Sequence, residues 1–366
     1  MCNGVSRGWF LAAAGAAALP LLASPASGAE LPAVPRGLGE GNARAAEIAR
    51  NSPFIRAQYA GALQLAHSIG NSQLRADVLG LIADPAPHYA RKYPSAGDRT
   101  ALRDALARAG FVKADDPVVG IFPPGTDGTS APQPFWSAPG SAYDSHHSYP
   151  GGLTVHEHFN ARMSEHFADT YNAIYFPQAR AVDRDLVIAA AFYHDVMKTA
   201  VFQFNADGTL LSELEIAGTG GHHCLSGAEA IVRGHDARFV TILLSAHAAP
   251  SLGDQVKVAA WCKAAAMIAG VDPVEYGLLD RDGNLAAIPP LEAFVSNLSD
   301  HDYVLSVHAV QQIEPRLAAL GPAGADSAEG RWWRHRVLAT ASAIALYEAA
   351  TRGDAAFVRA VRQAAG

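Results

Sequence analysis

One segment of the chain is apolar on every side. Residues 186–193 read Leu-Val-Ile-Ala-Ala-Ala-Phe-Tyr, and His194 and Asp195 follow directly. A helix of this composition has no face for solvent, so it must be buried all round. A carboxylate at the end of a buried helix loses its hydration unless it caps a helix, forms an ion pair or binds a metal ion. The chain must therefore enclose a helix and place positive charge beside Asp195.

The rest of the chain is long enough to supply that core. It has 366 residues, of which 49% are hydrophobic and 17% charged, which excludes disorder, collagen and coiled coils. Apolar residues recur at helical spacing over residues 42–109, 153–270 and 290–365. Residues 114–148 are rich in Pro, Gly, Ser and Asp and predict a long irregular connection, of the kind that often lines a site. Strand-like alternation occurs only around residues 202–211, so we predict a mainly α fold.

The first 29 residues are typical of a secretory signal peptide. One cation, Arg7, precedes an apolar run over residues 9–22, and small residues follow up to Ala29. The run of about 14 residues is shorter than the roughly 20 that a membrane-crossing helix needs. We therefore expect cleavage after Ala29 rather than an uncleaved anchor. The protein is predicted to be periplasmic or secreted, with no stable membrane anchor after cleavage.

Charge and cysteine content narrow the possible partners. The chain has 28 Lys and Arg against 35 Asp and Glu, a formal net charge of −7, and its cations form no stripe, so no nucleic acid is expected. After signal cleavage Cys224 and Cys262 are the only cysteines. Both lie in helical patterns and are predicted to be buried thiols rather than a disulfide. The oligomeric state is left open.

Several histidines recur at positions that face the core or lie at a helix end. Besides His194 they are His156, His222, His223 and His247. The solvated sides of the helix that carries His156 are expected to hold Glu157, His158, Arg162, Glu165 and His166. One buried histidine is usually an ordinary core residue, but several of them with a carboxylate make up the donor set that binds zinc, iron, manganese or nickel. Such an ion would supply the positive charge that Asp195 needs.

The blocks that carry these residues resemble the HD-domain metal-dependent phosphohydrolases, in the branch found in certain 3′-to-5′ exoribonucleases. Residues 146–156, His-His-Ser-Tyr-Pro-Gly-Gly-Leu-Thr-Val-His, are similar to that branch's His-His-x-Tyr-x-Gly-Gly-Leu-x-x-His. Residues 194–198, 223–227 and 244–247 are similar to its His-Asp-Ile-Gly-Lys, Gly-His-x-x-x-Gly and Leu-Ser-His-His blocks. All four blocks occur in the family's order over residues 145–250.

The resemblance implies an HD-type helical bundle that holds one or two divalent ions, with Mn, Fe, Zn, Ni and Mg not distinguished. It implies five metal ligands, His156, His194, Asp195, His223 and His247, with Asp195 able to bridge two ions. Lys198 would meet a phosphate oxygen of the substrate, the alternative being a solvated cation at a helix end. Three further histidines would contact substrate or support the ligands: His146, His147 and His222. The candidates for a carboxylate that orients a ligand imidazole are Asp144 and Glu157.

Three positions depart from the family pattern. Met197 stands at the signature glycine, and Ala246 stands at the first histidine of the Leu-Ser-His-His block. The later helix that normally supplies an Asp ligand corresponds to residues 257–267, which contain no carboxylate. Asp254 before this stretch and Asp272 after it are the alternatives.

These features predict an exported phosphohydrolase that cleaves a phosphomonoester or phosphodiester of a small phosphorylated substrate with metal-activated water. Asp195 and Lys198 are its predicted catalytic residues. One alternative is a degenerate, non-catalytic HD domain that acts as a binding module, and a second is a di-iron oxygenase of the same superfamily. The expected organisation is a signal peptide (1–29), N-terminal helices and a Pro/Gly-rich loop (30–140), the HD core (141–275) and C-terminal helices packed on that core (276–366).

Overall fold

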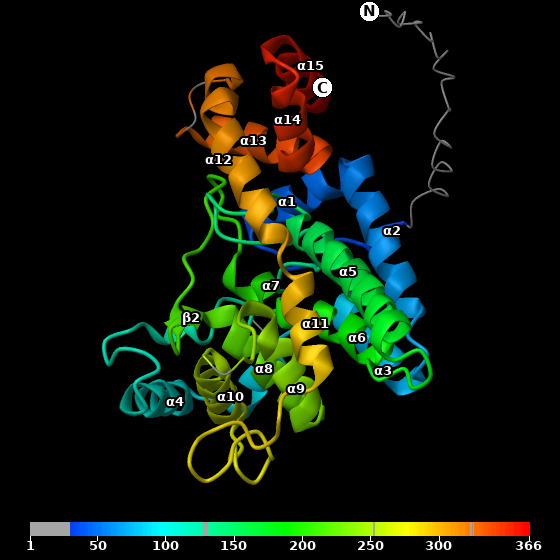
Figure 1. Cartoon of the computed structure of the whole chain (residues 1–366). Coiled ribbons are helices and arrows are strands. Elements are labelled where there is room, and N and C mark those ends of the chain that lie inside the picture. Colours follow the sequence, from blue (N-terminus) through cyan, green and yellow to red (C-terminus); the bar gives the residue numbers. More distant parts are fainter. Residues whose placement is uncertain (1–29, 127–130, 252, 323, 325) are drawn as a thin grey trace, which may run out of the picture.

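The computed structural model describes residues 30–126, 131–251, 253–322, 324 and 326–366 (Figure 1). The predicted signal peptide, residues 1–29, lies outside the described residues. Among the residues that are described, none of the helices combines the length and the apolar character that crossing a membrane requires.

Helices dominate the fold, which confirms the predicted mainly α class. In the described part of the chain, the sheet content is one antiparallel pair, β1 (Glu215–Ile216) and β2 (Thr219–Gly220). Its two-residue turn has positive φ at both Ala217 (54°) and Gly218 (73°), as a type I′ hairpin turn requires. The strand-like stretch expected at residues 202–211 forms a turn with a single bridge, between Phe204 and Leu210.

In the described residues, four α-helices precede the irregular connection, over the stretch where helical spacing was expected. They are α1 (Glu40–Asn51), α2 (Pro53–His67), α3 (Ser72–Ala83) and α4 (Ala96–Arg108), with a 3₁₀ turn, η1 (His88–Lys92), before α4. The start of α2 follows ordinary capping chemistry: the Ser52 hydroxyl accepts from the Ile55 N–H at 3.0 Å, and Pro53 occupies the first helical position. Where described, the connection that follows is irregular except for η2 (Val118–Gly120).

The central helices surround α6 (Arg184–His194), whose residues from Val187 to His194 are buried as predicted. The others are α5 (Gly152–Tyr175), α7 (Lys198–Val201), α8 (Gly221–Val232), α9 (Ala237–Leu244), η3 (Ser245–His247) and α10 (Gln255–Ala269). Helices α5, α9, α3 and α8 pack directly on α6. Cys224 and Cys262 are buried free thiols, which confirms that prediction.

The described residues after position 290 form five further helices: α11 (Leu291–Ser299), α12 (Asp302–Leu320), α13 (Ala328–Ala341), α14 (Ala343–Thr351) and α15 (Asp354–Ala365). Helices α12–α15, orange to red in Figure 1, gather at one end of the molecule, where α13 packs on α1 and α2. Helix α11 instead packs on α5, α6, α9 and η3. Helix α11, which lies beyond the predicted end of the HD core at residue 275, therefore packs among the central helices. The predicted domain boundaries themselves stay a prediction.

Candidate metal centre

Asp195 lies at the point where the buried helix α6 ends. It is the C-cap residue, with φ −117° and ψ 4°, and a turn then leads into α7. Its side chain is fully buried, and neither carboxylate oxygen has a hydrogen-bond partner of good geometry. Buried carboxylate oxygens without donors are costly, so the surroundings of Asp195 decide what this helix end can do.

A first set of side chains meets one oxygen of Asp195. The Nε2 atoms of His156 and His194 lie 3.1 and 3.4 Å from Asp195 Oδ2. The same two nitrogens lie 3.1 and 3.4 Å from Asp300 Oδ1. Helices α5, α6 and α11 thus bring two imidazoles and two carboxylates together.

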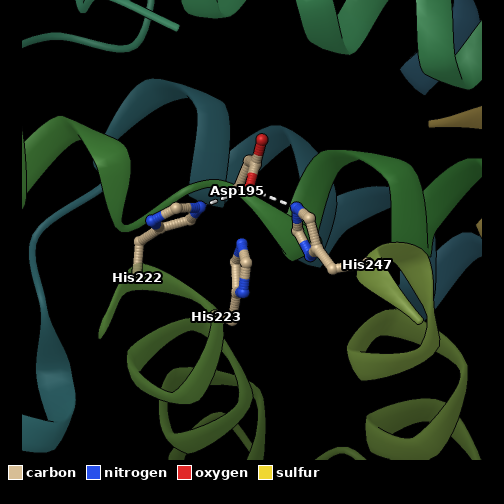
Figure 2. A group of neighbouring side chains, drawn as sticks. All are labelled: Asp195, His222, His223 and His247. Atoms are coloured by element: carbon tan, nitrogen blue, oxygen red, sulfur yellow. Dashed lines mark ion pairs between the residues drawn. The ribbon is translucent and has the colours of Figure 1, made fainter. Parts of the chain in front are cut away.

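A second set meets the other oxygen of Asp195. His222 Nε2 and His247 Nε2 lie 3.1 and 3.4 Å from Asp195 Oδ1, and His247 Nε2 also lies 3.4 Å from Asp300 Oδ2. The His223 ring stacks on His247 at 3.4 Å between centroids. Figure 2 shows His222 and His247 on either side of His223, with all three rings turned toward Asp195.

These distances are those expected of atoms that share a cation. Ligand atoms about 2.1 Å from an ion are about 3.0 Å apart at an octahedral angle and about 3.4 Å apart at a tetrahedral angle. The measured separations are 3.1 and 3.4 Å in both sets. Both Asp195 oxygens and His222 Nε2 are among the buried atoms that have no hydrogen-bond partner. The buried His and Asp side chains therefore fit a bound metal ion, and Asp195 offers one oxygen to each set.

Asp300 is the carboxylate that the sequence analysis missed. It is the buried C-cap residue of α11, and Asn160 Nδ2 donates to its Oδ1 at 3.0 Å. The two alternatives considered from sequence lie on the surface: Asp254 pairs with Lys257 at 2.9 Å, and Asp272 accepts from nearby backbone N–H groups. Asp300 follows a helix with one buried and one exposed side, so the all-round apolar pattern that marked Asp195 is absent there and no local signal pointed to it.

A carboxylate and a carbonyl orient His194. Its Nδ1–H donates to Ala191 O at 2.7 Å, and Glu157 Oε2 lies 3.4 Å from the same nitrogen. The placement of Glu157 on a solvated side of its helix was wrong: the residue is fully buried, because α2, α6 and α11 all pack on α5. Asp144, the other candidate for this supporting role, is exposed.

Glu213 orients His222 in the same way and was not anticipated. Its Oε1 accepts from the His222 backbone N–H at 2.7 Å and from the ring Nδ1–H, so that Nε2 faces Asp195. The close approach of this segment to the start of α8 depends on Gly221, where a Cβ would lie 2.6 Å from Leu214 O. Carboxylates that hold the second nitrogen of an imidazole are a regular feature of metal sites.

Lys198 is buried beside Asp195. Its side chain is only 2% exposed, and its ammonium forms an ion pair with Asp195 Oδ2. The alternative of a solvated cation at a helix end is therefore wrong. The Lys198 ammonium thus contacts Asp195 Oδ2, the same oxygen that His156 and His194 approach.

His146 and His147 form the wall of the centre next to His156. The Nδ1 atoms of His146 and His147 are 3.2 Å apart, and both rings group with His156. His147 has a left-handed backbone, with φ 53°. Its carbonyl accepts from Gly140 and Tyr149 N–H groups, both at 2.8 Å, and a Cβ on Gly152 would lie 1.8 Å from it. The glycine pair before α5 thus allows the chain to fold back tightly against His147.

The electrostatics of the centre divide its histidines into two kinds. Burial and neighbouring positive charge hold the pKa of His146, His147 and His223 well below the usual range. Burial also acts to lower the pKa of His156, but the adjacent carboxylates of Asp195 and Asp300 outweigh it and raise that pKa to about 9. For His194 the nearby Asp195 and Glu157 likewise overcome burial and raise the pKa. A cation must displace protons from these two imidazoles, so metal binding would release protons.

Comparison of the chain with protein-family models, with curated proteins and with solved structures finds no match.

Proposed function

We propose that the protein is an exported, metal-dependent phosphohydrolase of the HD type, which cleaves a phosphomonoester or phosphodiester of a small molecule. One observation carries the proposal. Each oxygen of Asp195 meets a different set of imidazole nitrogens, at separations that fit two cations bridged by this carboxylate. Paired cations that bind both the attacking and the leaving oxygen are a recurrent device of phosphatases and nucleases.

The chain's own residues would prepare the site for that reaction. A bound divalent ion supplies a nucleophile at neutral pH by lowering the pKa of its water to about 7. Ala191 O and Glu213 keep protons on the Nδ1 atoms of His194 and His222, which leaves each Nε2 lone pair directed at the centre. The Lys198 ammonium, held beside Asp195, is placed to bind a phosphoryl oxygen as a point charge.

The degenerate, non-catalytic alternative loses its main support. It rested on the missing late Asp ligand, and Asp300 supplies carboxylate oxygens to both sets. Ala246, at the position of the family's extra histidine, remains a departure; its side chain is buried. The remaining set of imidazoles and carboxylates is sufficient for two ions of four or more ligands.

The decisive experiment measures metal content and hydrolysis on the same preparations. The chain and a His194→Ala, Asp195→Ala double variant are purified, checked for helix content by circular dichroism, and analysed for metals. Hydrolysis of p-nitrophenyl phosphate and bis(p-nitrophenyl) phosphate is then measured. We expect bound divalent metal and hydrolysis in the unmodified chain and neither in the double variant. Asp254→Ala, which removes an exposed carboxylate, serves as the matched control.

Two results would overturn the proposal. Unchanged metal content in the folded double variant would show that the assigned residues bind no ion. Bound iron with a mixed-valent spectroscopic signal and no hydrolysis would replace the phosphohydrolase by the di-iron oxygenase.

Export is tested separately. Expression of the full chain in a bacterium, followed by fractionation and N-terminal sequencing, should recover a mature protein that begins at Glu30. Recovery of an uncleaved chain in the cytoplasm would contradict the proposed export.

A further inference from the structure

A cleft that contains none of the proposed metal ligands lies along α5. It is a cleft of about 880 Å³ between α2, α5, α12 and the start of α14. Cavities that bind small molecules typically measure about 300–1,000 Å³ and combine a mainly apolar lining with a few convergent polar groups. The cleft matches both criteria.

One wall of the cleft is an apolar row on α5. Val155, Phe159 and Met163 follow one another at intervals of four residues, so they lie on one face of the helix. Phe159 is 40% exposed, and Leu305 of α12, which lines the same cleft, is 46% exposed. Large apolar side chains that line a cleft and remain open to water are typical of a ligand-binding surface.

The inner end of the cleft is polar and buried. His147 Nε2 and Asp302 Oδ2 lie 3.4 Å apart, with side chains only 5% and 6% exposed. The Ser306 hydroxyl donates to Asp302 Oδ2 at 2.9 Å. A carboxylate has about four acceptor positions, so Asp302 can accept a further hydrogen bond from a molecule in the cleft.

The backbone around the cleft is held in an unusual conformation. Among described residues other than glycine, a positive φ occurs at His147, Arg180, Ala217 and Ser342. Two of these, His147 (φ 53°) and Ser342 (φ 59°), line the cleft. Conformations of this kind are energetically costly and cluster at ligand sites, where the surrounding structure enforces them.

The α2 side of the cleft is preformed as well. The His158 ring is held by Gln58, whose Oε1 lies 2.8 Å from His158 Nδ1. Gly61 makes room for this ring, because a Cβ there would lie 2.4 Å from it. Arg162, one helical turn further along α5 and also in the lining, pairs with Glu165 at 2.7 Å.

We infer that this cleft binds a small molecule with an apolar chain and a hydrogen-bond-donating end. The donor end meets Asp302 at the inner end, and the chain lies along Val155, Phe159 and Met163. A molecule that ends in a carboxylate is disfavoured, because it has no proton to donate to Asp302 and because the guanidinium in the lining, that of Arg162, is already paired with Glu165. The cleft shares His147 with the wall of the metal centre but contains none of the proposed ligands, so the inference holds whether or not the centre hydrolyses phosphate esters.

Isothermal titration calorimetry of the purified chain tests the inference with three probes of equal chain length: octan-1-ol, octylammonium and octanoate. We expect octan-1-ol and octylammonium to bind and octanoate to bind at least about tenfold more weakly, a difference of about 1.4 kcal/mol. Absence of binding by both donor probes, or octanoate binding as tightly as octan-1-ol, would overturn the inference.

A matched pair of variants on α5 locates the binding. Met163→Trp fills the cleft and should weaken octan-1-ol binding at least about tenfold. Ile174→Trp, on the same helix but 64% exposed and outside the cleft, should leave it unchanged. If Met163→Trp does not fold, Phe159→Glu at the partly exposed mouth serves instead and should weaken binding too. Unchanged binding in the folded cleft variant, or equal weakening in Ile174→Trp, would refute the location.

Discussion

The substitution Glu213→Gln tests how much the orientation of the His222 ring by one carboxylate contributes to metal binding. Glu213 Oε1 accepts from both the backbone N–H and the ring Nδ1–H of His222, which leaves Nε2 3.1 Å from Asp195 Oδ1. Glutamine has the same shape but no negative charge, and its amide can present a donor to the ring. Removal of such an orienting partner typically reduces metal affinity by about 10- to 100-fold, or about 1.4–2.7 kcal/mol.

Competition against a chromogenic chelator measures this loss directly, with Zn²⁺ as the probe ion. Glu215→Gln is the control, since Glu215 is exposed and only two residues along the same segment. We expect Glu213→Gln to bind Zn²⁺ about 10- to 100-fold more weakly than the unmodified chain, and Glu215→Gln to bind it equally well. Equal affinity in Glu213→Gln, or the same loss in both variants, would refute the reasoning that Glu213 positions His222.

Three further predictions follow from the structure. Asp300→Asn should reduce metal affinity by at least about tenfold, whereas Asp254→Asn, at an exposed carboxylate, should not; the same chelator competition checks both. Burial lowers the pKa of His335 to about 3, so the folded chain keeps it neutral while the unfolded chain takes up a proton below about pH 6.5. The free energy of unfolding therefore decreases as pH falls from about 6.5 toward 3. Between about pH 7.5 and 4.5 it should decrease by about 2–3 kcal/mol more in the unmodified chain than in His335→Gln, as measured by denaturant titration. Parallel pH profiles of the two proteins would contradict this. Gly61→Ala should lower the free energy of unfolding by about 1–3 kcal/mol, because its Cβ would lie 2.4 Å from the His158 ring, and an unchanged melting temperature would show that the ring moves aside freely.

Part of the centre could be predicted because the burial of its residues follows from local sequence patterns. His194 and Asp195 end a helix that is apolar all round, and His156 lies in the apolar row of its own helix. Buried polar groups must find partners, so their convergence followed from the pattern of burial. The helical class followed from the same periodicity.

The remaining parts depend on packing between distant segments. Asp300 reaches the centre because α11 crosses α5 and η3, an arrangement that no local pattern in residues 291–300 records. Glu157 was misplaced because a helical wheel assumes one buried face, whereas α5 is covered on several sides. Glu213 lies in a short segment without helical or strand periodicity, and its contact with His222 depends on the fold of the hairpin after it.

The position of Asp300 in the chain sets an order of assembly. The imidazoles of residues 156–247 are synthesised first, and the carboxylate that faces both sets comes only at the end of α11. A partly made chain would thus carry the nitrogen donors without their second acidic neighbour, and an ion bound at that stage would lack the Asp300 oxygens. In the complete protein a bound ion would link residues 156–247 to the end of α11.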